Sequence, residues 1–291
     1  VRAHLSILNQ RLIQGRPDMK TQTEKANAFK QLHESGCFVF PNPWDVGSAR
    51  ILAGLGFKAL ATTSQGFANA IGVQDYQITR DQKLDHCREL CAGTDLPVAA
   101  DLENGYGHSP ETCAETIRLA AEAGLIGGSI EDYNPEADAI YTIAEAADRV
   151  RAAVEAANAQ PFPFLITARS ENHLRGITDL KDTIARLQAF QEAGAHVLYA
   201  PFLPSLEAIK TVLSEIDRPL NVLGPAPAGH TVSQLEAIGV RRVSLGSALH
   251  TTILGALVSA GEELMETGSF GFLKHMLPGA RRDALLEAGT P

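Results

Sequence analysis

Several features that would indicate a particular class of protein are scarce or missing in this chain. It has 4 cysteines, at 37, 87, 91 and 113, which are too few for a disulfide scaffold and favour a reducing, cytoplasmic location. No apolar run approaches the roughly 18 residues of a membrane span, and the N-terminal segment lacks the apolar core of a signal peptide. With a net charge of −9 and no basic cluster, the chain is not expected to bind nucleic acid or a membrane.

Motifs of several common enzyme classes are also absent. No Gly-x-Gly-x-x-Gly follows the first predicted strand, which disfavours dinucleotide binding, and there is no Gly-x-Ser-x-Gly or paired-histidine zinc motif. No lysine ends a predicted strand, which disfavours a Schiff-base aldolase. A zinc cluster of His86, Cys87 and Cys91 is conceivable, but these residues share one helical pattern and lack a fourth ligand. Helix cysteines packed in the core are the simpler interpretation.

What the chain does contain is a regular alternation of short apolar runs and longer helical patterns. The apolar runs are 37–41, 59–63, 98–102, 127–131, 164–168, 196–200, 220–223 and 242–245. The helical patterns between them are 45–55, 80–92, 110–123, 143–157, 179–192, 205–215 and 232–237. Ser109 before Pro110 is a typical helix start, and Gly124, Gly194 and Gly239 each follow a helix as a left-handed cap would.

Eight strand–helix units predict an α/β fold, a closed (β/α)8 barrel of the TIM type, with a doubly wound open sheet as the alternative. We expect one domain over residues 1–291, with the barrel core at about 36–250 and an added N-terminal helix before it. Residues 251–291 predict a helical extension whose apolar side chains exceed what one barrel needs. Such surplus apolar surface indicates a homo-oligomer, either a dimer or a tetramer.

Carboxylates gather where two neighbouring strands are predicted to end. Asp101 and Glu103 are two residues apart, so they would share one side of the chain if strand geometry persists that far. Glu131 and Asp132 follow the next strand, although Asp132 could instead orient a neighbouring residue. Acids so close together would repel one another unless a cation or strong donors offset them. A hard cation such as Mg²⁺, which prefers oxygen ligands, suits this pattern.

Other strand ends supply groups that handle anions. Arg169 can clamp a carboxylate or a phosphonate through two hydrogen bonds, although it could instead be a structural ion pair. Thr63 and Ser64 offer neutral donors, and Asn221 lies on the seventh strand, where it could also cap a turn. A metal held by the carboxylates would bind substrate oxygens and stabilise a developing enolate. Three further residues have simpler interpretations: Asp45 as a helix cap, Trp44 as packing, and His230 as a loop residue.

Taken together, these motifs resemble the isocitrate lyase/phosphoenolpyruvate mutase superfamily over most of the chain, from about 38 to 260. The matching segments are Pro41-Asn42-Pro43-Trp44-Asp45-Val46-Gly47-Ser48-Ala49-Arg50, Thr62-Thr63-Ser64, Asp101-Leu102-Glu103-Asn104-Gly105-Tyr106-Gly107, Ser129-Ile130-Glu131-Asp132 and Ala168-Arg169-Ser170-Glu171. The resemblance implies a Mg²⁺-dependent enzyme, with Mn²⁺ as a substitute, that acts on a 2-oxo acid through a pyruvate-like enolate. It also implies a tetramer in which neighbouring barrels exchange a C-terminal helix.

The resemblance further assigns roles to individual residues. Asp101 would be the main metal carboxylate, Glu103 and Glu131 would act largely through metal-bound waters, and Asp75 would lie near the metal. The substrate acid group would be held by the following residues: Thr63, Ser64, Gln65 and Arg169.

The loop after the fourth strand departs from the family pattern. The lyase branch carries a loop there whose cysteine donates a proton, but residues 131–142 of this chain contain no cysteine, lysine or histidine. The mutase and phosphonopyruvate-hydrolase branches use a lysine and an asparagine there, and only Asn134 echoes that pattern. A general acid has therefore to come from elsewhere, from solvent, from Tyr133 or, in a lyase, from Tyr141.

These observations favour an enzyme that cleaves a C–C or P–C bond of a small 2-oxo or 2-hydroxy di-acid. Decarboxylation of an oxaloacetate-like acid fits the missing loop best, with Arg169, Glu131 and Tyr133 as the catalytic candidates. Three alternatives stay open: a 2-methylisocitrate-lyase-like reaction, a phosphonopyruvate-type mutase or hydrolase, and a non-catalytic protein that binds 2-oxo acids.

Overall fold

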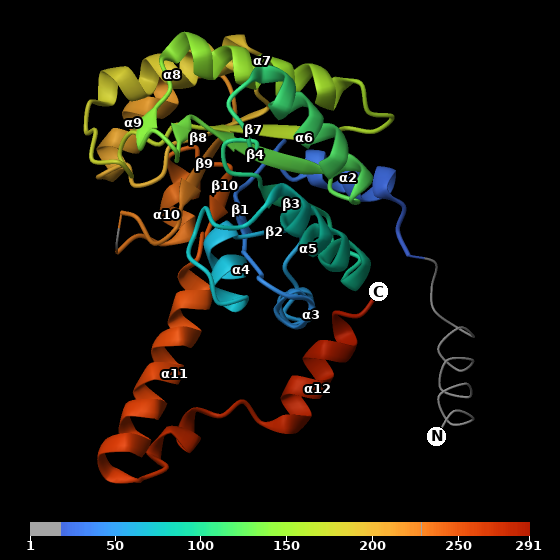
Figure 1. Ribbon diagram of the computed structural model, residues 1–291, viewed down its shortest axis with the longest axis vertical. Helices are drawn as coiled ribbons and strands as arrows, with labels where there is room; N and C mark the ends of the chain where they lie inside the picture. Colours follow the sequence, from blue (N-terminus) through green and yellow to red (C-terminus); the bar gives the residue numbers. More distant parts are fainter. Residues whose placement is uncertain (1–18, 228) are drawn as a thin grey trace.

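Eight parallel strands form one sheet that curls into an almost closed barrel surrounded by helices (Figure 1). The computed structural model describes residues 19–227 and 229–291. The strands are β1 (Phe38–Phe40), β2 (Leu60–Ala61), β3 (Val98–Asp101), β4 (Gly127–Glu131), β7 (Leu165–Arg169), β8 (Val197–Tyr199), β9 (Leu220–Leu223) and β10 (Arg242–Ser244). They follow the spatial order β1-β10-β9-β8-β7-β4-β3-β2.

The two ends of this strand order meet where β1 ends. The Ala61 amide donates to the Pro41 carbonyl at 3.0 Å, and the Asn42 side-chain amide donates to the Thr62 carbonyl at 3.0 Å. These bonds join β1 to β2 and bring the sheet back on itself. The predicted TIM-type barrel is therefore confirmed, and the open-sheet alternative is ruled out.

Helices cover the outside of the barrel and connect successive strands. They are α3 (Val46–Gly54), α4 (Ser64–Ala70), α5 (Arg80–Gly93), α6 (Pro110–Glu122), α7 (Ile143–Asn158), α8 (Leu180–Glu192), α9 (Leu206–Ser214) and α10 (Val232–Ala237). The expected cap residues are present, since Asp45 accepts from the Ser48 amide at 2.6 Å and Ser109 from the Thr112 amide at 3.2 Å. Gly124 and Gly194 have φ angles of 97° and 96°, the left-handed conformation predicted for them.

Two short elements were not predicted, and both lie beside the candidate site. Helix α4 follows β2 and is only 7 residues long, too short to show a helical period in the sequence. After β4, the strands β5 (Tyr133–Asn134) and β6 (Ala139–Ile140) form an antiparallel hairpin. This hairpin lies in the segment 131–142, which contains no cysteine, lysine or histidine.

Helix α2 (Gln22–Gln31) closes the barrel at the N-terminal ends of its strands. The Phe29 ring is 1% exposed and lies 5.2 Å from the Phe40 ring and 6.3 Å from the Phe38 ring, measured between centroids. Part of the predicted N-terminal helix is thus present, whereas residues 1–18 lie outside the described residues.

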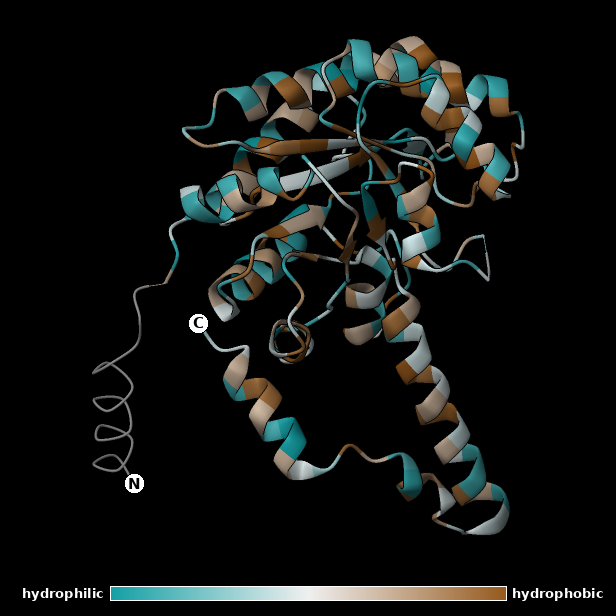
Figure 2. Cartoon of the chain, turned by 180° about the vertical axis from the view of Figure 1, so that it is seen from behind, coloured by the Kyte–Doolittle hydropathy of each residue, from teal (hydrophilic) through white to brown (hydrophobic). Residues whose placement is uncertain are grey.

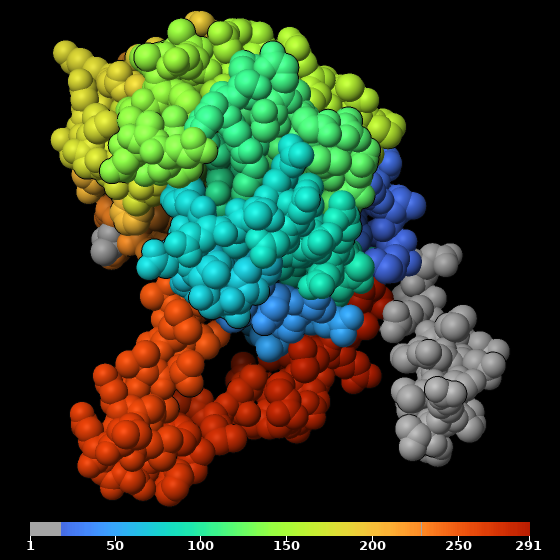
Figure 3. Space-filling view, in the orientation of Figure 1, coloured from blue at the N-terminus to red at the C-terminus, as the bar shows by residue number. Residues whose placement is uncertain are grey.

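The predicted C-terminal extension forms an arm that projects from the barrel, as the space-filling view in Figure 3 shows. Helix α11 (Ala248–Thr267) runs outward, the short helix η1 (Gly271–His275) turns the chain, and α12 (Gly279–Ala288) returns to pack against α3. Helix α11 carries many apolar residues, which are brown in Figure 2, and among them Leu257 is 66% and Met265 88% exposed. Among the described helices, none is long and apolar enough to cross a membrane.

We predict that Phe29→Ala lowers the free energy of unfolding by about 3–5 kcal/mol, because it leaves a cavity under the barrel. Lys30→Ala, on the neighbouring exposed position of the same helix, should change it by less than about 0.5 kcal/mol. Urea unfolding followed by circular dichroism measures both. Equal stability of the two variants would show that α2 does not seal the core.

Candidate active site

Asp101, the last residue of β3, lies at the centre of a polar cluster at the C-terminal end of the barrel. The Ser64 hydroxyl donates to its Oδ2 at 3.1 Å, and the Ser129 hydroxyl lies 3.4 Å from its Oδ1. Burial alone would raise the pKa of Asp101, but the positive charges of Arg169 and Lys83 outweigh burial and hold this pKa below its usual value. Asp101 is therefore ionised at neutral pH.

Arg169, at the end of β7, is the cation that holds three acids together. Its Nη1 lies 3.3 Å from Glu131 Oε2 and 3.7 Å from Asp101 Oδ2, and its Nε pairs with Glu171. The sheet register sets this arrangement, because Glu131 and Arg169 are paired on neighbouring strands. The Arg169 side chain is 14% exposed, so water screens these attractions only weakly.

Asp75 lies in the loop between α4 and α5, close to Asp101. Its Oδ1 atom is buried without a hydrogen-bond partner, and burial together with the charge of Asp101 raises its pKa. A bound cation would relieve both the missing partner and the repulsion between the two carboxyl groups. Among the described residues no three His, Cys, Asp or Glu side chains form a ready-made metal cage. Asp75 and Asp101 nevertheless fit Mg²⁺, which takes one or two protein carboxylates and keeps several waters.

Glu103 does not share a side of the strand with Asp101, because β3 ends at Asp101 and Glu103 takes a left-handed φ of 49°. Its side chain is 4% exposed, and the Tyr106 hydroxyl donates to Oε1 at 3.4 Å. Burial and the neighbouring charge of Asp101 raise the pKa of Glu103 to about 8. The alternation that was expected to make the two acids converge is thus lost, and a role of Glu103 at the metal remains a prediction.

Tyr76, which sequence reasoning missed, links Glu131 to the cavity. Its hydroxyl donates to Glu131 Oε1 at 2.7 Å and accepts from Arg175 Nη2 at 2.6 Å. Burial and the charge of Glu131 raise the pKa of Tyr76, so it remains a neutral phenol. Burial and the carboxylate of Glu171 raise the pKa of Glu131, so Glu131 holds a proton more readily than an ordinary glutamate.

Tyr133 and Tyr141, the tyrosines considered as proton donors, have hydroxyls engaged elsewhere. The Tyr133 hydroxyl donates to Asp138 Oδ1 at 2.7 Å within the β5–β6 hairpin, and the Arg175 guanidinium lies 3.4 Å from the centre of its ring. The Tyr141 hydroxyl lies 2.7 Å from His108 Nδ1. The geometry therefore gives Tyr133 a supporting place beneath Arg175.

Asp132 orients its neighbours, as one interpretation of the sequence anticipated. Its Oδ1 accepts from the Glu171 amide at 2.7 Å, and its Oδ2 pairs with Arg186 Nη1 at 3.0 Å. Burial raises the pKa of Asp132 to about 6, although both of these contacts favour its charged form. Asp132 thereby fixes the main chain that carries Glu171, which in turn pairs with Arg169.

Two adjoining hollows open at this end of the barrel. The larger one, which we call the outer cavity, measures about 520 Å³. Its polar lining includes the following residues: Thr63, Ser64, Gln65, Asp75, Tyr76, Asp101, Arg169, Arg175 and Tyr199. The predicted substrate residues of strand two thus lie at this cavity, where Thr63 also caps α4 and the Gln65 side chain accepts from Ser247 at 2.7 Å.

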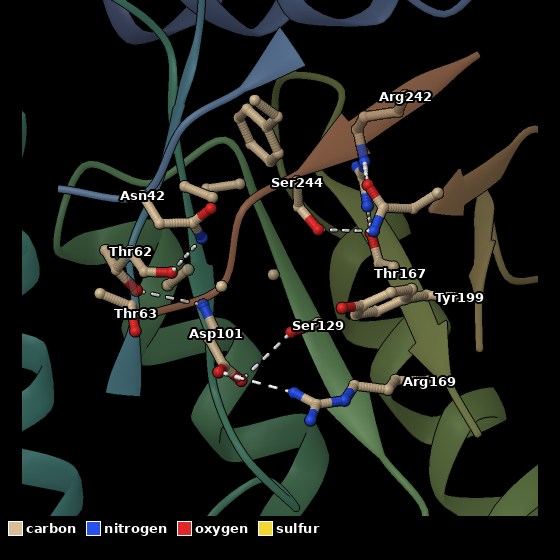
Figure 4. Close-up of a pocket in the computed structure, with 17 residues that line it drawn as sticks. Asn42, Thr62, Thr63, Asp101, Ser129, Thr167, Arg169, Tyr199, Arg242 and Ser244 are labelled. Carbon is tan, nitrogen blue, oxygen red and sulfur yellow. Dashed lines mark hydrogen bonds and ion pairs between the residues drawn. The ribbon is translucent and has the colours of Figure 1, made fainter. Parts of the chain in front are cut away.

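The smaller hollow, which we call the inner chamber, measures about 70 Å³ and lies within the barrel (Figure 4). Asn221 lines this chamber and not the outer cavity, whereas Thr63 and Arg169 line both hollows. Its Oδ1 accepts from Arg242 Nε at 2.8 Å, and its Nδ2 donates to Ser244 at 2.8 Å. Arg242 was not anticipated as a site residue, because it lies at the start of a strand rather than at its end.

The fold and the site define a TIM-barrel protein. Its clustered acids and Arg169 lie at the C-terminal ends of the strands, the face where such barrels carry their active sites. The family model described as phosphoenolpyruvate phosphomutase matches residues 29–265, and the chain belongs to this family. The resemblance found in the motifs is thereby confirmed.

Individual relatives agree with this assignment. A crystal structure of a Burkholderia cenocepacia J2315 protein, provisionally assigned as a lyase or mutase, is similar with a TM-score of 0.89 and 49% identity, over 93% of this chain and 99% of that one. An uncharacterized protein of Mycobacterium tuberculosis H37Rv is 32% identical, over 86% of this chain and 96% of its own. Oxaloacetate decarboxylase 1 of Pseudomonas putida W619 is 26% identical, over 79% of this chain and 81% of its own.

The raised pKa of Glu103 makes stability depend on pH with a definite sign. The folded protein retains this proton between the unfolded pKa near 4.5 and the folded value of about 8, so the stability contributed by protonated Glu103 is lost as pH rises through that window. Between pH 5 and pH 8.5, the free energy of unfolding should therefore fall by roughly 2–4 kcal/mol more in the parent than in Glu103→Gln.

Urea unfolding in the presence of a metal chelator measures this difference. Glu34→Gln, in the exposed turn after α2, is the matched control and should follow the parent. Parallel pH curves for the parent and Glu103→Gln would contradict the assignment.

Proposed function

We propose that this protein is a Mg²⁺-dependent enzyme that cleaves a C–C bond of a small 2-oxo di-acid, with decarboxylation of an oxaloacetate-like acid as its reaction. The observation that carries the proposal is the pairing of Asp101, kept ionised by Arg169, with Asp75, whose buried oxygen lacks a partner. Both carboxyl groups line the outer cavity, which is large enough for a small di-acid. The similarity to an oxaloacetate decarboxylase supports the choice of reaction.

In this proposal, Asp101 and Asp75 hold the metal, with Glu103 and Glu131 behind them. Mg²⁺ or Mn²⁺, when bound, would supply positive charge near the oxygen on which the enolate charge develops. The hydroxyls of Thr63 and Ser64 and the amide of Gln65 would hold the remaining acid group, since all three line the outer cavity. Arg169 would attract the developing enolate oxygen, because its guanidinium is buried and fixed by Glu131 and Glu171.

The proton that completes the reaction can be assigned to a residue of this chain. Loss of carbon dioxide leaves the electron pair of the broken C–C bond on the enolate, whose carbon must then gain one proton. Tyr76 lines the outer cavity and is hydrogen-bonded to Glu131, whose pKa is raised. We assign the donor role to the Tyr76 hydroxyl: when Glu131 is protonated, the carboxyl O–H of Glu131 can donate to the Tyr76 oxygen, which frees the Tyr76 proton for the enolate carbon, and the proton of Glu131 then replaces it. Tyr133, the donor first considered, would then support Arg175.

The exposed arm supports a homo-oligomer as part of this proposal. Leu257, Met265 and Phe270 are between 63% and 88% exposed on one chain, which is a large apolar surface to leave in water. A second copy of the chain is the natural cover for it.

We predict Mg²⁺-dependent release of pyruvate from oxaloacetate, with kcat/KM at least about 10³-fold lower in Asp101→Asn. A coupled pyruvate assay measures it, with and without chelator. Because free metal ions decarboxylate oxaloacetate slowly, Asp101→Asn at the same Mg²⁺ concentration is the control that corrects for this background.

Other substrates in the same assay separate the alternatives. Release from 2-methylisocitrate or 2,3-dimethylmalate would favour a C–C lyase, and release from phosphonopyruvate would favour P–C cleavage. If no substrate is turned over but oxalate binds in a Mg²⁺-dependent way, the result would favour a non-catalytic binding protein over an enzyme.

Tyr76→Phe and Tyr133→Phe form a matched pair for the proton donor. We expect Tyr76→Phe to lower kcat by about 10²-fold with little change in KM, because only the proton transfer is removed. Tyr133→Phe should lower kcat less than about threefold, since its ring would still pack against Arg175. Equal effects of the two variants, or none, would remove Tyr76 from the donor role.

A further inference from the structure

The inner chamber has a distinct chemical character of its own. Small side chains leave room for it, because Ala61, Ala99 and Gly128 lie along its wall. Figure 4 shows Thr62, Ser129, Tyr199 and Ser244 around it, with Arg242 on one side and Asp101 toward the opposite side. A space of about 70 Å³ admits a few waters or one small ion.

Arg242 brings a positive charge to this chamber, and the centre of the Phe40 ring lies 5.1 Å from its guanidinium carbon. It is 4% exposed, and its hydrogen-bond partners are the neutral atoms Asn221 Oδ1 at 2.8 Å, Thr167 Oγ1 at 2.9 Å and His33 Nε2 at 3.4 Å. In the part of the chain that the structure describes, no carboxylate pairs with it. Burial lowers the pKa of Arg242 to about 9, so it still carries its charge at neutral pH.

The hydroxyls that line the chamber are arranged to donate. Thr62 Oγ1 accepts from the Asp101 amide at 3.1 Å, and Thr167 Oγ1 accepts from Arg242 Nη2 at 2.9 Å. Ser244 Oγ likewise accepts from Asn221 Nδ2 at 2.8 Å. A hydroxyl oxygen that has accepted from an N–H keeps its own proton for another acceptor. The protons of Thr62 and Thr167 next to a buried guanidinium favour an electron-rich occupant, because an unpaired buried charge is costly.

We propose that the inner chamber is a carboxylate subsite, in which Arg242 and the hydroxyls of Thr62, Thr167 and Ser244 bind a group of one or two carbons. Its anion-binding residues differ from the Asp101–Asp75 pair, and its binding test needs neither a metal nor turnover, so the subsite can fail independently of the proposed reaction. The carboxylate could belong to a small free anion or to the end of a substrate that enters from the outer cavity, since Asp101, Arg169 and Tyr199 line both hollows.

Titration of the metal-free protein with sodium formate, by calorimetry and by thermal shift, tests the proposal. Sodium chloride at the same ionic strength corrects for screening. We expect formate to bind and to raise Tm, and Arg242→Met to weaken binding by at least about tenfold. The matched control is Arg241→Met, because Arg241 is the neighbouring residue in the chain and its Nη1 donates to the Gly36 carbonyl at 3.3 Å instead. Arg241→Met should bind formate like the parent.

Thr167→Val is the second variant, because it removes one hydroxyl at nearly constant volume and keeps the test decisive if Arg242→Met does not fold. It too should weaken formate binding. Equal formate affinity in Arg241→Met and in either chamber variant, or no binding to the parent, would overturn the proposal. Crystals soaked in formate that show only water in the chamber would also overturn it.

A competition experiment distinguishes the two sources of the carboxylate. If oxalate with Mg²⁺ and formate bind together, the chamber takes a free anion. If oxaloacetate displaces formate and Arg242→Met raises KM without lowering kcat, the chamber holds the substrate's own carboxylate. Either result supports the subsite, whereas formate binding that persists unchanged in either chamber variant does not.

Discussion

The attraction between Arg169 and three carboxyl groups is the interaction on which the rest of this site depends. Glu131, Asp101 and Glu171 are drawn together at the mouth of the barrel, where burial alone would raise the pKa of Asp101 and of Glu131. Arg169 alone cannot neutralise three acids, and the second guanidinium, Arg175, pairs only with Glu171 among these three, at 3.4 Å, so charge is distributed unevenly among them. Asp101 keeps its negative charge, whereas Glu131 retains a proton more readily. The same cluster thus contains a carboxylate that can bind a cation, Asp101, and a carboxyl group that can hold a proton, Glu131.

This uneven distribution requires that the acids stay in place, and the barrel provides that constraint. The register of β4 against β7 puts Glu131 beside Arg169, and Asp132 holds the main chain of Glu171 from the other side. Asp132 is itself anchored by Arg186 on α8. Helix α8 is therefore connected to the site through a series of buried ion pairs. Removing one partner of a pair would leave the charge of the other uncompensated.

The sequence predicts the architecture well because strong local signals repeat along it. Eight apolar runs, cap residues such as Asp45 and Ser109, and left-handed glycines such as Gly124 all have direct structural counterparts. The site is predicted less completely, because backbone conformation beyond a strand end leaves no periodic signal. Glu103 turns away at a left-handed residue, and Tyr76 reaches Glu131 from a loop, itself with a φ of 61°. Tyr199 ends a strand that carries no charged residue, so a search for charges passes over it.

The charged residues that line the two hollows alternate in sign along the barrel axis. Because of this alternation, two hollows of different charge can lie next to each other within one barrel. Arg242 is positive at the floor of the inner chamber, Asp101 is negative between the two hollows, and Arg169 is positive beside it. An anion in the inner chamber would face Arg242 and strengthen the field that draws a cation toward Asp101 from the other side. A cation at Asp101 would in turn reduce the repulsion between that carboxylate and an anion below it. If both proposed sites bind their ligands, occupancy of one hollow would therefore favour occupancy of the other.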